Sequence, residues 1–254
     1  MAKTVNQQAQ YGSWVSKPTI YVSLILTLIF AVPAVWFWPL IIPAALCFVF
    51  TVYFTYSRYL FSPKGKNVQN QIWDIAVSKL AWNGNGKVLD IGCGNGALTI
   101  KVAKKFPKVK VTGIDYWGPK WDYSKSQCEQ NASIEGVSDR VVFQKASASN
   151  LPFDDGYFDA AVSNLCFHEV SDTKDKRELI REALRVVKKG GKFSFQDLFL
   201  FRQVYGDVDE LLEEIRGWGI AKVELSVTMD AEFIPSALKL PFMLGRIAII
   251  AGEK

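Results

Sequence analysis

The sequence is poor in the residues that build metal clusters and disulfide scaffolds. Its 254 residues contain four cysteines, none of them in a CxxC pair, and one histidine, His168. Four scattered cysteines are too few for a disulfide scaffold, and one histidine cannot anchor a His-based metal cluster. We therefore expect reduced thiols in a domain that faces the cytosol, and no bound metal.

Acidic residues are missing from the first quarter of the chain. Residues 1–61 carry three basic side chains and no Asp or Glu, whereas the other 193 residues carry 27 basic and 25 acidic side chains. A remainder with a net charge of only +2 gives no reason to expect nucleic acid as a partner. The overall composition, 49% hydrophobic and 22% charged, excludes a disordered or fibrous chain.

No charge occurs in the forty residues between Lys17 and Arg58. One helix needs about 20 apolar residues to cross a bilayer, so this run fits two crossings. The run is too long for a cleavable signal peptide, and no small-residue cleavage site follows it. Three prolines break helices near its middle and predict a reversal near Trp38–Pro43. We predict a transmembrane helical hairpin in residues 19–61, with helices over Thr19–Trp38 and Leu40–Tyr59.

The basic residues around this run predict its orientation. They lie on the same side of the proposed hairpin, so both chain ends are expected in the cytoplasm. The prediction is a multi-pass membrane protein with a cytoplasmic tail at 1–18, the hairpin, and a catalytic domain at 62–254. A hairpin that dips into one leaflet of the bilayer is the alternative.

Strand-like and helix-like segments alternate after residue 62. The predicted strands are Lys87–Ile91, Lys110–Ile114, Arg140–Lys145, Phe158–Asn164, Lys192–Asp197, Lys222–Val227 and Arg246–Ala251. The predicted helices are Val68–Trp82, Ala97–Lys105, Pro119–Glu135, Lys174–Lys188 and Asp207–Arg216. This alternation predicts an α/β fold, a doubly wound, mostly parallel, Rossmann-like sheet of seven strands. No helical pattern separates the last two strands, which favours an antiparallel end strand.

The densest chemical pattern is KVLDIGCGNGA at residues 87–97. A hydrophobic strand ends at Asp90, and Gly92 and Gly94 then lie in a turn before a helix. Glycines let the backbone turn sharply and approach a ligand closely, and the start of the helix offers free N–H groups. A second strand ends in Asp115, where an acid can accept hydrogen bonds from both ribose hydroxyls of a nucleoside.

Two cofactors suit this turn. The spacing Gly92-x-Gly94-x-x-Ala97 also satisfies the dinucleotide fingerprint, so the turn alone does not separate NAD from S-adenosylmethionine (SAM). Asp90 favours SAM, because an acid directly before the turn suits a cationic amino acid end and repels a pyrophosphate. A turn that merely joins strand to helix is the structural alternative.

Two more patterns follow in order along the chain. The run LPFDDGYFD at residues 151–159 precedes an apolar strand, and RVVKKGG at residues 185–191 ends an amphipathic helix before another strand. With the glycine turn and Asp115, this series resembles the class I SAM-dependent methyltransferases, especially the small-molecule branch with the ubiquinone/menaquinone and sterol enzymes. The resemblance covers about Lys87–Asp197 and is specific for fold and cofactor, but poorly specific for the substrate.

The resemblance implies a residue for each part of the cofactor. Asp90, Gly92 and Gly94 line the methionine portion of SAM, and Asp115 holds the ribose. The remaining cofactor residues it implies are Tyr116 against the adenine, Ser147 and Ala148 beside it, and Asn164 in the same crevice. Many relatives have an Asp where this chain has the serine, and a hydroxyl is a weaker acceptor than a carboxylate. The helix before the first strand is expected to cover the cofactor cleft, as it often does in relatives.

The acceptor of the methyl group is less well defined. His168 is the candidate general base, with Glu169 beside it; a packing histidine behind the fourth strand is the alternative. The run NLCF at residues 164–167 lacks the prolines typical of enzymes that methylate amino groups of nucleic acids. Because of the predicted hairpin, we expect a membrane-anchored methyltransferase with a small, lipophilic acceptor. The alternatives are a non-catalytic SAM-binding membrane protein and an NAD(P)-dependent oxidoreductase.

Overall fold

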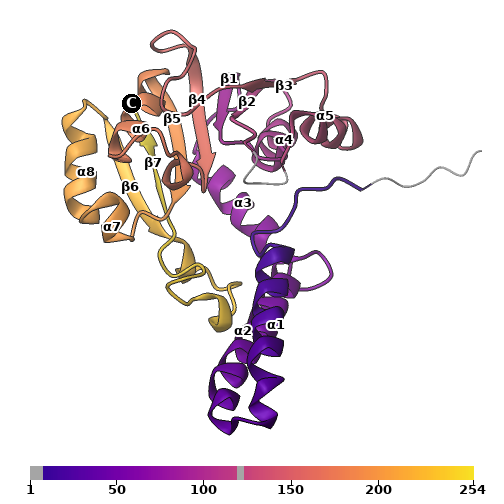
Figure 1. Cartoon of the computed structure of the whole chain (residues 1–254). Helices are drawn as coiled ribbons and strands as arrows, with labels where there is room; N and C mark the ends of the chain where they lie inside the picture. The colour runs from indigo at the N-terminus through magenta and orange to yellow at the C-terminus, as the bar shows by residue number, and fades with distance from the viewer. Residues whose placement is uncertain (1–7, 119–122) are drawn as a thin grey trace, which may run out of the picture. The chain divides into compact units, whose positions relative to one another are not determined.

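The structure is a computed structural model, which describes residues 8–118 and 123–254. The chain forms two compact units, one of Ser13–Gln71 and one of Met1–Gly12 with Ile72–Lys254. Figure 1 shows the first as a helical hairpin and the second as a sheet with helices around it. The segment at 8–12 thus belongs to the α/β unit, although the sequence placed it in a separate tail.

The hairpin consists of α1 (Lys17–Ala31) and α2 (Ile41–Phe61), which lie side by side (Figure 1). Ser16 caps α1 by accepting a hydrogen bond from the backbone of Thr19 at 3.3 Å. Hydroxyl groups lie between the two helices: Thr51 Oγ1 donates to Ser23 Oγ at 3.0 Å. The outward faces are apolar and exposed, which is the reverse of a water-soluble helix pair.

The chain reverses earlier than the sequence analysis predicted. The first helix ends at Ala31, and two short 3-10 turns, Pro33–Val35 and Trp38–Leu40, lead into α2. Pro33 stops the helix because its nitrogen carries no hydrogen and its ring clashes with the preceding turn. Pro43 is tolerated inside α2 because it lies in the first turn, where a backbone N–H has no partner within the helix.

Two spans in this hairpin are long and apolar enough to cross a membrane, judged by length and composition. They are Lys17–Val35, with a mean hydropathy of 2.1, and Trp38–Phe61, with 1.8. Trp36 and Trp38 lie in the reversal between α1 and α2, and their exposed fractions are 82% and 73%. Indole rings at such a position are typical of the boundary between a bilayer and water.

The sheet has seven strands in the order β3-β2-β1-β4-β5-β7-β6. They are β1 (Gly86–Ile91), β2 (Val109–Asp115), β3 (Val141–Lys145), β4 (Phe158–Asn164), β5 (Val187–Asp197), β6 (Lys222–Val227) and β7 (Ala248–Glu253). Strands β1 to β5 pair in parallel, and β7 pairs antiparallel with both β5 and β6. The predicted Rossmann-like fold with its antiparallel end strand is confirmed.

Helices cover both sides of this sheet (Figure 1). They are α3 (Val68–Lys79), α4 (Ala97–Lys105), α5 (Lys125–Ile134), α6 (Arg177–Arg185), α7 (Arg202–Tyr205) and α8 (Val208–Gly217). Alternate residues of β5 serve the two faces, as the pleat of a strand requires. Phe193 and Phe195 pack in the core with α6 and α8, whereas Ser194 Oγ donates to the carbonyl of Ala76 in α3 at 2.7 Å.

Several elements differ in length or bounds from their predictions, and β5 and α5 show why. Strand β5 begins at Val187, five residues early, because the backbone of Val187 pairs with Phe158 before a register shift in β4. Helix α5 begins at Lys125, where Ser124 caps it by accepting from the backbone N–H of Gln127 at 3.2 Å. Residues 119–122 of the longer predicted helix lie outside the described residues.

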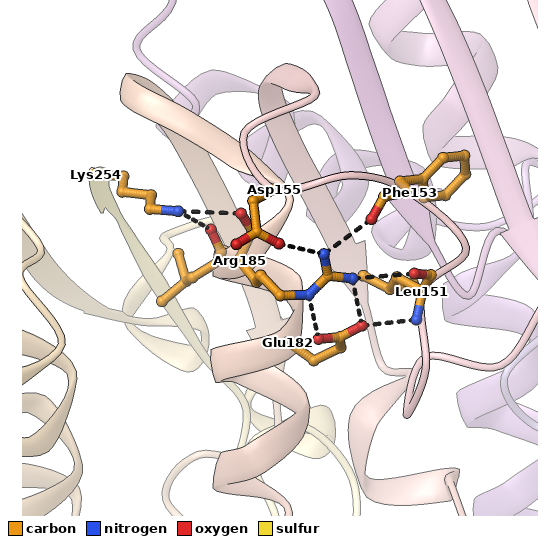
Figure 2. Close-up of polar contacts among 7 residues, drawn as sticks. Leu151, Phe153, Asp155, Glu182, Arg185 and Lys254 are labelled. Carbon is orange, nitrogen blue, oxygen red and sulfur yellow. Dashed lines mark hydrogen bonds and ion pairs between the residues drawn. The ribbon is translucent and has the colours of Figure 1, made fainter.

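Arg185 joins the motif at 151–159 to the motif at 185–191 in the folded chain. Its guanidinium forms a forked pair with Glu182, with two N–O distances of 2.8 Å, and donates to Asp155 at 2.6 Å (Figure 2). It also donates to the carbonyls of Leu151 and Phe153. These bonds raise the pKa of Arg185 and fasten the loop before β4. The two motifs therefore support the scaffold.

Candidate active site

The sheet order places a reversal at its centre. The chain runs outward from β1 through β2 to β3 and then returns to β4 on the other side of β1. In an open α/β sheet, ligands bind at the carboxyl ends of the strands beside such a reversal. Asp115 and Asn164 are the last residues of β2 and β4 at this point, and Asp90 is the next-to-last residue of β1.

The glycine turn joins β1 to α4. Gly92, Gly94 and Gly96 have φ angles of 73°, 57° and 82°, a region that side chains with a Cβ rarely adopt. A Cβ on Gly92 would lie 2.3 Å from the Sγ of Cys166, so only glycine fits beside the segment that follows β4. The turn is therefore shaped by backbone geometry and by close approach together.

Asp115 holds this turn from the end of β2. Its Oδ2 accepts from the backbone N–H of Gly94 at 2.9 Å, and its Oδ1 accepts from that of Trp117 at 2.8 Å. Burial raises the pKa of Asp115, and these N–H donors oppose the rise. Each carboxylate oxygen keeps a second lone pair for a ligand hydroxyl. The structure thus brings together two parts of the predicted cofactor site.

Asp90 is the most unusual carboxyl group of the site, because it is only 1% exposed. Thr99 Oγ1 donates to its Oδ2 at 2.5 Å, and its Oδ1 has no hydrogen-bond partner among the described residues. Burial raises the pKa of Asp90 to about 7, although the Thr99 bond lowers it. Asn164 Oδ1 is likewise buried without a partner in the described part of the chain. Unpaired buried acceptors are costly, so both fit a site that receives a donor.

Trp117, two residues after β2, contacts the turn. Its Nε1 donates to the carbonyl of Gly94 at 2.9 Å. Tyr116 is 63% exposed, and the Lys145 ammonium lies 4.9 Å from its ring centroid. Adenine packing by Tyr116 stays a prediction, and the structure adds Trp117 as a neighbour of the turn.

The predicted adenine end has a carboxylate that the sequence analysis missed. Ala148 is buried, and Ser147 Oγ lies 2.8 Å from Ser149 Oγ and 3.2 Å from an Asp172 oxygen. Ser149 Oγ donates to the same oxygen at 2.7 Å. These hydroxyl bonds lower the pKa of Asp172. No sequence signal marks Asp172, because it lies 25 residues from Ser147, in the loop after β4.

His168 lies in a 3-10 turn, Phe167–Glu169, just after β4. Its Nδ1 is 2.6 Å from Asp197 Oδ1, and its Nε2 is 3.5 Å from Glu169 Oε1. Burial opposes the imidazolium charge, but the bonds to Asp197 and Glu169 and their charges raise the pKa of His168 to about 9. The side chain is 19% exposed, so one edge of the ring stays accessible.

Asp197, at the end of β5, was not predicted as a site residue. It is fully buried and accepts from the backbone N–H of Phe167 at 2.9 Å and from that of Leu198 at 2.6 Å. These bonds fix the carboxylate that faces the imidazole of His168. Its position at a strand end, beside the end of β4, is the signal that could have identified it.

Two bulky residues at the site have strained backbone. Trp117 and Leu165 have φ angles of 44° and 54°. Leu165 directly follows the end of β4 at Asn164, and Trp117 lies two residues after the end of β2 at Asp115. A non-glycine residue in this region costs roughly 1–3 kcal/mol and tends to occur at functional sites.

The helix expected to cover the cofactor cleft, α3, contacts α4 and β5, and its covering role stays a prediction. Asp74 of α3 pairs with Lys101 of α4 at 2.5 Å, and Ala76 accepts from Ser194 of β5. The glycine turn is approached by residues 10–12, through Asn131 and Tyr123. No group of three or more His, Cys, Asp or Glu suited to a metal ion occurs in the described residues.

Comparisons with known proteins agree on the central region. Residues 88–191 match a family described as a methyltransferase domain. The ubiquinone/menaquinone biosynthesis C-methyltransferase UbiE of a Geobacter species is 32% identical over 136 residues, which cover 51% of this chain and 55% of that protein. The 27-O-demethylrifamycin SV methyltransferase of Amycolatopsis mediterranei is 34% identical over a match that covers 51% of this chain and 45% of that protein. The ribosomal RNA small subunit methyltransferase C of Escherichia coli is 34% identical, covering 52% and 36%. The chain spans about half the length, or less, of these curated relatives.

Solved structures show the same fold. The geranyl diphosphate C-methyltransferase from Streptomyces coelicolor, in complex with S-adenosyl-L-homocysteine, has a TM-score of 0.56 at 15% identity and covers 76% of this chain and 81% of that one. The [4+2]-cyclase SpnF has a TM-score of 0.54 at 22% identity and covers 73% and 81%. At these identities the likeness establishes the α/β architecture.

Proposed function

We propose, from the premise that this chain carries a class I SAM-dependent methyltransferase domain, that it transfers a methyl group from SAM to a small, lipophilic acceptor at a membrane. The premise fits both the matched region and the glycine turn within it. SAM, when bound, supplies a methyl group activated by its sulfonium. The task of the protein is then to bind the cofactor, orient the acceptor and exclude water.

The observation that carries the proposal is Oδ1 of Asp90 at the glycine turn, which has no hydrogen-bond partner within residues 8–118 and 123–254. A buried carboxyl group with a free acceptor next to backbone N–H groups suits the ammonium of an amino acid better than a phosphate. The acid before the turn thus favours SAM over NAD. We assign Asp90, Gly92 and Gly94 to the methionine end, and Asp115 to the ribose.

The adenine end and the crevice complete the assignment. Tyr116, Ser147 and Ala148 are proposed for the adenine, and Asn164, with its unpaired buried oxygen, is proposed to face the crevice. The Asp172 carboxylate beside Ser147 supplies a charged hydrogen-bond acceptor, which is stronger than the hydroxyl of Ser147. This compensates for the serine that stands where many relatives have an Asp.

His168 is proposed as the general base, within limits set by its pKa. With a pKa of about 9, about one imidazole in a hundred is neutral at pH 7. When His168 is neutral, Asp197 holds the proton on Nδ1. Nε2 can then accept a proton from the molecule that receives the methyl group. Base catalysis should therefore grow as the pH rises toward 9.

Membrane attachment rests on the hairpin. Two spans of sufficient length and hydropathy, with exposed apolar faces and no acidic residue from 1 to 61, fit a bilayer with both chain ends in the cytoplasm. A lipophilic acceptor follows from that location. The UbiE relative is named for ubiquinone/menaquinone biosynthesis, and compounds of that class are lipophilic.

Isotope labelling tests the activity. Membranes with the wild-type chain and with Asp90→Ala are incubated with SAM that has a labelled methyl group, and lipid extracts are analysed by mass spectrometry. A labelled lipophilic product that depends on Asp90 is expected; labelled product only in the RNA or protein fraction would contradict the proposed acceptor class. The anchor is tested by extraction: detergent, and not high salt, should release the protein, and release by salt would refute the hairpin.

A second candidate is a SAM-binding protein that transfers no methyl group. The structural likeness to SpnF, a cyclase, supports this second candidate, because the same architecture is found in a protein named for another reaction. Binding of SAM without labelled product in a broad acceptor screen would favour this candidate. An oxidoreductase would instead bind NADH in preference to SAM by saturation-transfer NMR.

A further inference from the structure

Residues 8–12 of the α/β unit are held against the cofactor turn by one buried side chain. Asn131 of α5 is fully buried. Its Oδ1 accepts from the backbone N–H of Gln10 at 2.8 Å, and its Nδ2 donates to the carbonyl of the same residue at 3.0 Å. The amide thus pairs with residue 10 as a neighbouring strand would.

The same amide group also reaches the glycine turn. Asn131 Nδ2 donates to the carbonyl of Asn95 at 2.9 Å, and Asn95 Oδ1 accepts from the backbone N–H of Ser124 at 3.1 Å. Gln127 Nε2 donates to Asn131 Oδ1 at 3.0 Å and completes its partners. Three segments far apart in sequence are therefore joined at one buried amide: residue 10, the turn, and the start of α5.

Aromatic packing joins the same segments. A Cβ on Gly12 would lie 3.3 Å from the Tyr123 ring, and a Cβ on Gly94 would lie 3.5 Å from it, so the ring is close to both glycines. Burial, with the charges of Asp115 and Glu169, raises the pKa of Tyr123. Tyr11 OH donates to Glu135 at 3.3 Å and so fixes residues 10–12 to the end of α5.

We propose that Gln8–Gly12 is a strap that closes the cofactor site, and that Asn131 is the positioning residue that locks the strap to the glycine turn. This inference rests on the proposed function, since the turn must be where SAM binds. A turn held in its bound shape loses less conformational freedom on binding, which increases affinity. By the same coupling, bound SAM should stabilise the strap.

A proline substitution tests the strap with Asn131 intact. Gln10→Pro removes the backbone N–H that donates to Asn131 Oδ1. Gln10→Ala is the matched control, because it keeps the backbone N–H and carbonyl of residue 10 and changes only an exposed side chain. In the detergent-solubilised full chain, titration calorimetry with SAM should show about tenfold weaker binding for Gln10→Pro and less than twofold for Gln10→Ala. Equal affinities for the two variants would overturn the proposal.

Hydrogen exchange separates this role from a merely structural one. In the wild-type chain, SAM should slow amide exchange at Tyr11 and Gly12, and without ligand the amides of residues 94–96 should exchange faster in Gln10→Pro than in Gln10→Ala. Asn131→Asp, which lacks the two Nδ2 donors, should repeat the affinity loss. If Gln10→Pro showed faster amide exchange at residues 94–96 but an unchanged affinity for SAM, the role of the strap in cofactor binding would be overturned, and the proposed function would stand. Failure of the wild-type chain to bind SAM would overturn the proposed function as well.

Discussion

The histidine pair offers the most direct physical test, because His168 is the only histidine of the chain. Asp197→Asn removes the charge that faces Nδ1 at 2.6 Å and keeps the size of the side chain. Burial lowers the pKa of an imidazole while Glu169 still raises it, so the pKa of His168 should fall clearly below 9 in this variant.

The magnitude follows from linkage between protonation and folding. A pKa of about 9 in the folded chain, against 6.5 for an ordinary histidine, corresponds to roughly 3 kcal/mol of stability. Because the folded value is the higher one, this contribution is complete below about pH 6.5 and is lost as the pH rises through about 9. The free energy of unfolding of the wild-type chain should therefore decrease over this interval. Asp197→Asn should be less stable at pH 6 and should show a smaller decrease.

The assay is a titration by NMR. The ring Cε1–Hε1 signal of a chain labelled with 13C-histidine reports one residue, so it needs no assignment. A wild-type midpoint near 9 and a clearly lower midpoint in Asp197→Asn are expected. Glu169→Gln is the companion variant, and its effect should be smaller because Glu169 is 3.5 Å from the ring.

A wild-type midpoint at or below 6.5 would refute this reasoning about the His168–Asp197 pair. It would also remove the expected increase of kcat/KM between pH 7 and 9. A midpoint near 9 in both wild type and Asp197→Asn would show that another group sustains the charge.

Three further predictions concern the cofactor turn. Asp115→Ala should weaken SAM binding at least tenfold by calorimetry, because it removes both the ribose acceptor and the bond to the Gly94 N–H; an unchanged affinity would exclude Asp115 from the site. The affinity of the wild-type chain for SAM should fall as the pH drops below about 7, where Asp90 becomes protonated, and this pH dependence should be absent in Asp90→Asn. Gly92→Ala should lower the stability in urea unfolding more than Gly136→Ala. Both glycines have positive φ, which costs alanine about 1–2 kcal/mol, but only at Gly92 would the new Cβ also meet Cys166; equal losses would contradict the packing argument.

The regular elements were largely predictable because their signals are local. Strand β4 and helix α4 have the predicted ends, since continuous apolar runs and a glycine turn mark them in the sequence. The glycine turn and Asp115 were assigned to one site because carboxyl ends of parallel strands meet at the same edge of a sheet. The hairpin reversal was misplaced, because composition shows that prolines interrupt the helices but does not show which proline ends the first one.

The contacts around the site needed the tertiary structure. Asp197 and Asp172 reach His168 and Ser147 across 29 and 25 residues of sequence, and Asn131 reaches Gln10 across 121. Neither spacing nor hydrophobic period encodes which side chains face each other across separate loops.

The amino-acid sequence by itself determined the α/β class, the apolar hairpin and the glycine turn with its two acids, because periodicity, missing charge and backbone freedom are properties of short segments. Only the tertiary structure decided that one oxygen of Asp90 has no hydrogen-bond partner among the described residues, that Asp197 and Glu169 raise the pKa of His168, and that residues 10–12 approach the turn. Burial and pairing depend on what the folded chain places within a few ångströms, and that is set by the packing of segments distant in sequence.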